Sequence, residues 1–142
     1  MKVCAHNGLS IVVLTRNEHC PPHVHVGSDK WEARFEFSFW HNDVSLWDVT
    51  PVQNQPTKTV LEGLRQTLKK PVNLRRAREI WWDCLQSVCL INQRWDGALN
   101  EVVDTAAGNP QSKLIQAASF DRTKYQTVLQ LAGQSDPVEI WL

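Results

Sequence analysis

Residues 31–40 read WEARFEFSFW, and this stretch decides the fold. Apolar and polar side chains alternate along it, which is the period of a β-strand that buries one face. The apolar set is Ala33, Phe35, Phe37 and Phe39, and the polar set between them is Glu32, Arg34, Glu36 and Ser38. The stretch therefore predicts a sheet with one face turned to a core.

Three further strands are predicted around this one. Residues 10–16 are β-branched and apolar, residues 23–26 alternate in polarity, and residues 44–49 follow a turn. Short turns are expected at residues 27–29 and 41–43, which are rich in Gly, Asn, Asp and Ser. The economical interpretation is one N-terminal antiparallel β-sheet of about four strands.

The hydrophobic period changes after Pro51, and two helices are predicted to cover the sheet. The first begins at Pro56 or Thr57 and ends at Pro71, because the residue before a proline avoids the α region. Its apolar stripe is Val60, Leu61, Leu64 and Leu68. The second is capped by Asn73 and runs to about residue 93. Its expected core face is Leu74, Ala77, Ile80, Trp81, Cys84, Leu85, Val88 and Ile91, with Arg75, Arg76, Arg78 and Asp83 mostly toward solvent.

Residues 94–142 are expected to form a C-terminal extension of mixed helix and strand. Residues 99–107 are weakly helical, and residues 121–132 fit a helix capped by Asp121, with a strand fitting almost as well. Residues 138–142 alternate and predict a closing strand. The predicted fold class is α+β, with a sheet-plus-helices domain over residues 1–93 and the extension, residues 94–142, packed on it.

The composition is that of a folded protein of ordinary domain size. The chain has 142 residues, of which 42% are apolar and 21% charged. No apolar run reaches the roughly 18 residues of a membrane span, and no signal-peptide core follows Met1. We therefore expect a cytoplasmic protein with no membrane contact, in which the 4 cysteines are free thiols.

The densest chemistry lies in residues 16–26, RNEHCPPHVHV. Residues two apart on a strand share a face, so His23 and His25 are expected to project side by side. His19 precedes the stiff Pro21–Pro22 corner and could close on them.

Three interpretations of this loop are open. A metal site would use His19, His23 and His25, completed by a carboxylate or water, with a divalent metal such as zinc; Cys20 and Glu18 are further candidates. An acid–base site would use the same three histidines as catalytic residues, with Arg16 stabilising negative charge. In the third interpretation, the histidines only cap loop carbonyls and help to pack the corner.

Residues 17–26, NEHCPPHVHV, resemble the domain of unknown function 4160 (DUF4160) family. That family carries an acidic-His-x-Pro-Pro-His-x-His-Val pattern between two strands, followed by a hairpin and helices. The resemblance covers residues 9–93 approximately, and the extension goes beyond the usual short domain. Its motif positions are occupied here by His19, Pro21, Pro22, His23 and His25. The resemblance implies a small bacterial protein, often encoded beside another small protein in a layout like a toxin–antitoxin pair.

A basic cluster lies where the two predicted helices meet. Its members are Lys69, Lys70, Arg75, Arg76 and Arg78. Such cations could bind nucleic-acid phosphates, or they could form a solvated helix face. The formal net charge of +0 favours the second interpretation for this cluster taken alone.

The leading functional hypothesis is a component of a toxin–antitoxin-like or phage-conflict module. As an enzyme it would be a ribonuclease, or more broadly a metal-dependent hydrolase, acting through the histidine cluster. The alternative is a non-catalytic protein-binding module that inhibits or regulates a partner, as an antitoxin does. Expected partners are a small protein encoded nearby and RNA, and a homodimer is also open.

Overall fold

The computed structural model describes residues 1–104 and 110–142, which group into two compact units. The first unit is Met1–Ser38 with Asn42–Leu85, and the second is Phe39–His41 with Gln86–Leu142. The second unit thus begins again at Gln86, whereas the sequence predicts a boundary after residue 93. Packing of residues 94–142 on the N-terminal domain stays a prediction.

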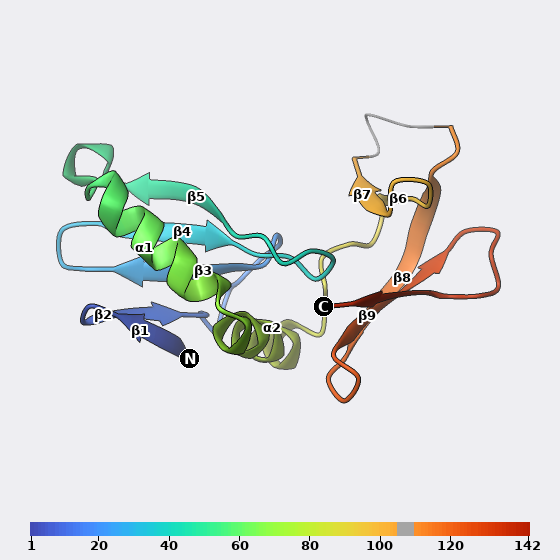
Figure 1. Ribbon diagram of the computed structural model, residues 1–142, viewed down its shortest axis with the longest axis horizontal. Helices are drawn as coiled ribbons and strands as arrows, with labels where there is room; N and C mark the ends of the chain where they lie inside the picture. The colour runs from blue at the N-terminus through green and yellow to red at the C-terminus, as the bar shows by residue number, and fades with distance from the viewer. Residues whose placement is uncertain (105–109) are drawn as a thin grey trace. The chain divides into compact units, whose positions relative to one another are not determined.

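The first unit is built on a five-stranded antiparallel sheet in sequential order (Figure 1). Its strands are β1 (Lys2–His6), β2 (Leu9–Val12), β3 (His23–Gly27), β4 (Glu32–Glu36) and β5 (Ser45–Thr50). The α+β class is confirmed, but the sheet has one strand more than the four expected. The additional strand is β1, which pairs with β2 across a turn at Asn7 and Gly8, both at positive φ. Asn-Gly is a strong hairpin signal, and it marks this strand, which was not among the four predicted.

Strand register fixes which side chains share a face of this sheet. Val24 pairs with Phe35 and Val26 with Ala33, and all four are buried at 1% exposure or less. The other face carries the alternate residues, with His25 directly opposite Arg34, and Arg34 opposite Asp48. One face therefore builds the core, and the opposite face gathers ionisable side chains from β3, β4 and β5.

Two helices, α1 (Lys58–Lys69) and α2 (Pro71–Leu85), complete the first unit, and Figure 1 shows α1 running across the sheet. The Thr57 side chain caps α1 by accepting from the Val60 N–H. The helix buries Leu61, Leu64 and Leu68 as predicted, whereas Val60, expected on the same stripe, is exposed. A short 3-10 helix, η1 (Val52–Asn54), precedes it. The second helix begins two residues before Asn73 and ends at Leu85, well short of residue 93, because Gln86 adopts a positive φ of 51°.

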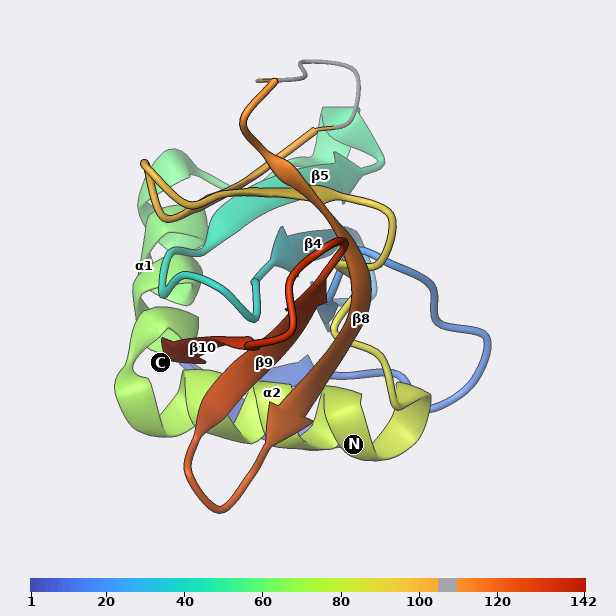
Figure 2. The ribbon, with the colours of Figure 1, turned by 90° about the vertical axis from the view of Figure 1, so that its right-hand side faces the viewer.

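The second unit is a five-stranded antiparallel sheet in the order β10-β9-β8-β6-β7. Its strands are β6 (Arg94–Asp96), β7 (Glu101–Val103), β8 (Lys113–Asp121), β9 (Gln126–Leu131) and β10 (Val138–Trp141), and Figure 2 shows the β8–β9 hairpin from the front. Residues 86–104 and 110–142 contain no helix, which corrects the expected mixture of helix and strand.

The expected helices of the extension fail for local reasons. Asp121 Oδ1 accepts from the N–H groups of Thr123 and Lys124, so it closes a tight turn into β9 and does not start a helix. Of the weakly helical stretch 99–107, residues 101–103 form β7, and residues 105–107 lie outside the described residues. The closing strand, expected over residues 138–142, is confirmed.

The cysteines divide into two groups. Cys4 and Cys84 are free thiols. Cys20 and Cys89 are disulfide-bonded, so the expectation of free thiols is wrong for these two. No helix in the described part of the chain is long and apolar enough to cross a membrane.

Arg78 is fully buried at 0% exposure, although its place in the helix pattern predicts a solvent-facing cation. Its Nε donates to the Ser38 carbonyl at 2.8 Å, and its Nη2 donates to Asn42 Oδ1 at 3.0 Å. Ser38 and Asn42 flank the three residues that leave the first unit for the second. Arg78 therefore bonds α2 to the residue on each side of this three-residue segment.

Replacing Arg78 with leucine should lower the free energy of unfolding by roughly 3 kcal/mol, since two buried acceptors lose their donor. The matched control is Arg75→Leu on the same helix, where the lost partner is an ion pair to Glu79 and the Arg75 side chain is 48% exposed. That change should cost less than about 1 kcal/mol. Urea unfolding followed by tryptophan fluorescence measures both, and equal losses would contradict the anchoring role.

Candidate metal centre

His23 and His25 project from the same face of β3, as the alternation predicts. His23 is 1% exposed, the side chain of His25 is 14% exposed, and their ring centres are 5.0 Å apart. Val24 and Val26, which alternate with them, lie in the core. The strand therefore presents two neighbouring imidazoles from a rigid, well-packed element.

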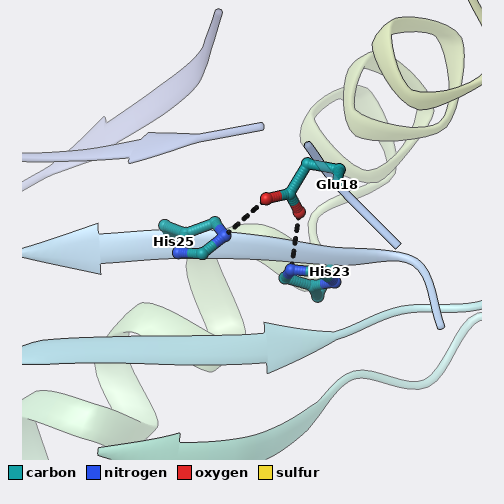
Figure 3. A group of neighbouring side chains, drawn as sticks. All are labelled: Glu18, His23 and His25. Carbon is teal, nitrogen blue, oxygen red and sulfur yellow. Dashed lines mark hydrogen bonds and ion pairs between the residues drawn. The ribbon is translucent and has the colours of Figure 1, made fainter. Parts of the chain in front are cut away.

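Glu18 brings a carboxylate to the two histidines from the loop between β2 and β3. Its side chain is 6% exposed, with Oε2 2.6 Å from His23 Nε2 and Oε1 3.3 Å from His25 Nε2. Figure 3 shows both rings turned toward this carboxylate. One ligand atom from each residue lies within 4.8 Å of the others, which suits a single ion.

The opposite ring nitrogens bind acceptors outside the cluster. His23 Nδ1 lies 2.7 Å from the Pro21 carbonyl oxygen, and His25 Nδ1 bonds to Glu32 Oε1. Carbonyl and carboxylate oxygens only accept, so each Nδ1 carries its hydrogen and donates. In a neutral ring, Nε2 then presents a lone pair, and both of these lone pairs face Glu18.

Burial favours the neutral form of His23. Loss of solvation is the largest cause and lowers the pKa of this imidazole, while the Pro21 bond and the Glu18 charge oppose the shift. A neutral Nε2 and an ionised carboxylate oxygen 2.6 Å apart are both acceptors and repel each other. Glu18 Oε2 is also buried, and no hydrogen-bond donor among the described residues reaches it. A cation between these atoms would remove the repulsion.

This donor set matches known habits of protein metal sites. Ligating histidines commonly donate their second N–H to a carboxylate or a backbone carbonyl, which fixes the ring and its tautomer. Two imidazoles and one carboxylate are a common zinc set with a fourth position left for water. Two indoles enclose the buried ring: His23 lies 5.1 Å from the Trp47 ring centre and 5.4 Å from that of Trp81.

An arginine lies beside this cluster on the adjacent strand. Arg34 donates through Nε to Asp48 Oδ1 at 2.8 Å and through Nη2 to Asp48 Oδ2 at 2.5 Å. Its Cζ lies 4.1 Å from the centre of the Trp47 ring. The Arg34 hydrogen bonds lower the pKa of Asp48, which keeps that carboxyl ionised. A cavity of about 250 Å³ opens here, lined by His25, Glu32, Arg34, Asp48 and Thr50.

Two of the residues expected at the site stand outside the convergent set. His19 is exposed, and its ring centre lies 5.9 Å from that of His23, at the rim. Arg16 is exposed in the loop, and within the described part of the chain no hydrogen bond or ion pair joins it to the cluster. The carboxylate of Glu18 is the third group that converges with His23 and His25, and Arg34 is a cation on the adjacent strand. The expected roles of His19 and Arg16 stay predictions.

The basic residues are not brought to this cluster. Lys69 pairs with Asp43 at 3.1 Å, Arg75 pairs with Glu79 at 2.8 Å, and Arg76 donates to the Lys2 carbonyl at 3.1 Å. Lys70 is exposed between α1 and α2, and Arg78 is buried. None of these bonds leads to His23 or His25.

Comparison with protein-family models, with curated proteins and with solved structures finds no match for this chain. Membership of the DUF4160 family therefore stays a prediction that depends on the motif in residues 17–26.

Proposed function

We propose that this protein binds a divalent transition metal, zinc first, through Glu18, His23 and His25, and that this site is a hydrolytic centre. One observation carries the proposal: both histidines donate through Nδ1 to outer acceptors, so both Nε2 atoms converge on one buried carboxylate. Two nitrogens and one oxygen are donors that zinc accepts readily.

The hydrolytic assignment follows from the number of ligands. Structural zinc sites use four protein ligands, whereas three leave a position at which zinc lowers the pKa of water. The chain's own groups would hold the site rigidly, with Pro21 and Glu32 orienting the rings. Trp47 and Trp81 would limit the access of bulk water to His23.

For the biological role we propose a component of a toxin–antitoxin-like or phage-conflict module that acts on RNA. The resemblance of residues 17–26 supports this role, and Lys69, Lys70, Arg75 and Arg76 are exposed cations that could meet RNA away from the centre. A cytoplasmic location belongs to the same proposal, although disulfide-bonded Cys20 and Cys89 are uncommon in a reducing compartment.

A non-catalytic protein-binding module is the second candidate. The observation in its favour is exposed apolar surface: Trp141 on β10 is 67% exposed, and Val72 on α2 is 74% exposed. Tryptophan is enriched in protein interfaces, where it supplies much of the binding energy. Such a protein would capture a small protein partner or a second copy of itself, and would need no metal.

Wild-type protein purified without chelator should hold about one zinc per chain, as expected of a three-ligand site with supported histidines. His25→Ala and Glu18→Gln should lose it, and the matched control, His19→Ala, should keep it. Elemental analysis by mass spectrometry measures the ratio, and circular dichroism confirms that each variant is folded.

The same proteins separate the candidates for function. Zinc-loaded wild type should degrade purified RNA, and His25→Ala should not. Absence of zinc from wild type, or retention by a folded His25→Ala variant, would refute the metal centre. Equal RNA degradation by both proteins would indicate a contaminant and would remove the ribonuclease.

Glu32 should matter through the ring that it orients. Glu32→Gln should weaken zinc binding by roughly 10–100-fold, because the amide accepts the His25 Nδ1–H less strongly than a carboxylate does. Glu36→Gln is the matched control, since Glu36 lies on the same face of β4 but opposite His23. Competition with a fluorescent zinc chelator measures both affinities, and equal values would contradict the orienting role.

A further inference from the structure

Arg34 is a cation that the structure holds in one orientation. Two parallel hydrogen bonds to Asp48 fix the plane of its guanidinium, and the Trp47 ring lies against it with Cζ 4.1 Å from the ring centre. Those bonds use the Nε–H and one Nη2–H. The guanidinium has five N–H groups in all, so a second edge of the fork is left for a ligand.

The cavity beside Arg34 is lined by one of the proposed metal ligands, His25. Arg34 and the ligand His25 are direct cross-strand partners and line the same space of about 250 Å³. That volume accepts a group of a few heavy atoms. A ligand in the cavity would therefore touch the guanidinium at one end and lie beside His25 at the other.

We propose that Arg34 binds the phosphoryl group of the substrate, so that the substrate of this centre is a phosphoester. This inference rests on the metal-centre function proposed above and names its substrate class and its anion-binding residue. Clamping between a metal ion and an arginine fork is a recurrent way to hold phosphoryl oxygens. RNA is one source of such a group, and a small phosphate ester is another.

The charges around the cavity favour an anion only when the metal is bound. Glu18, Glu32 and Asp48 are three carboxylates near Arg34, so the metal-free cluster repels anions. Asp48 is paired with Arg34, and Glu32 with His25 Nδ1–H. A divalent ion together with Arg34 would offset all three negative charges, which would remove the repulsion of a phosphoryl group that binds Arg34.

The test uses inorganic phosphate as the probe and the full chain loaded with zinc and freed of excess metal. Zinc content is measured first in every sample. Isothermal titration should then show saturable binding of phosphate to the wild type. Arg34→Gln should keep its zinc and bind phosphate at least roughly tenfold more weakly, the effect of one lost charge-assisted hydrogen-bond pair.

Two further variants keep the result interpretable. Arg34→Lys keeps the positive charge but loses the planar guanidinium. Its phosphate affinity should lie between those of the wild type and Arg34→Gln. Lys58→Gln removes an exposed cation from the first turn of α1, outside the cavity, and should leave phosphate affinity unchanged. Cleavage of a short RNA and of a nitrophenyl phosphate diester by the same samples separates the two sources of phosphoryl group.

The outcomes separate this inference from the function that it rests on. Zinc bound by wild type without phosphate binding, or with equal binding by a folded Arg34→Gln variant, would overturn the role of Arg34 and leave the metal centre standing. Equal competition by acetate would overturn the choice of a phosphoryl group. A chain that binds no zinc would remove both proposals.

Discussion

Two imidazole nitrogens converge on one buried carboxylate in the first unit. Pro21 and Glu32 accept the Nδ1 hydrogens of His23 and His25, so both Nε2 atoms face Glu18. Placing acceptors together in a buried setting is costly unless a positive charge joins them. The fold holds this arrangement on a core strand, and the proposed cation would join the three ligand atoms.

The remainder of the first unit serves this arrangement. Val24 and Val26 anchor β3 in the core, and β4 and β5 place Arg34 and Asp48 beside it by register. Trp47 contacts both His23 and Arg34, so one indole packs against the proposed metal centre and against the neighbouring cation. The proposed metal centre and the proposed anion-binding arginine would therefore share one supporting side chain.

The sequence predicts the features that depend on local periodicity. Alternation places His23 and His25 on one face of a strand, and the Thr57 cap and Pro71 mark the ends of α1. Local periodicity predicts less where contacts between distant residues determine the structure. An aspartate in this sequence context fits a helix cap as well as a turn, and Asp121 closes the β8–β9 turn. Arg78 has the spacing of a solvent-facing residue, but its bonds to Ser38 and Asn42 hold it in the interior. Glu18 and Arg34 could be assigned to the site only once the loop path and the β3–β4 register were known.

The protonation of His23 and His25 in the metal-free protein tests the central claim most directly. Nitrogen-15 NMR distinguishes the two neutral tautomers of imidazole, and His23→Gln and His25→Gln variants assign the signals. At neutral pH, the account predicts a protonated Nδ1 on both rings and, for buried His23, an unprotonated Nε2. A neutral His23 ring with the hydrogen on Nε2 would make the Glu18 contact an ordinary hydrogen bond, and the case for a metal centre would fail.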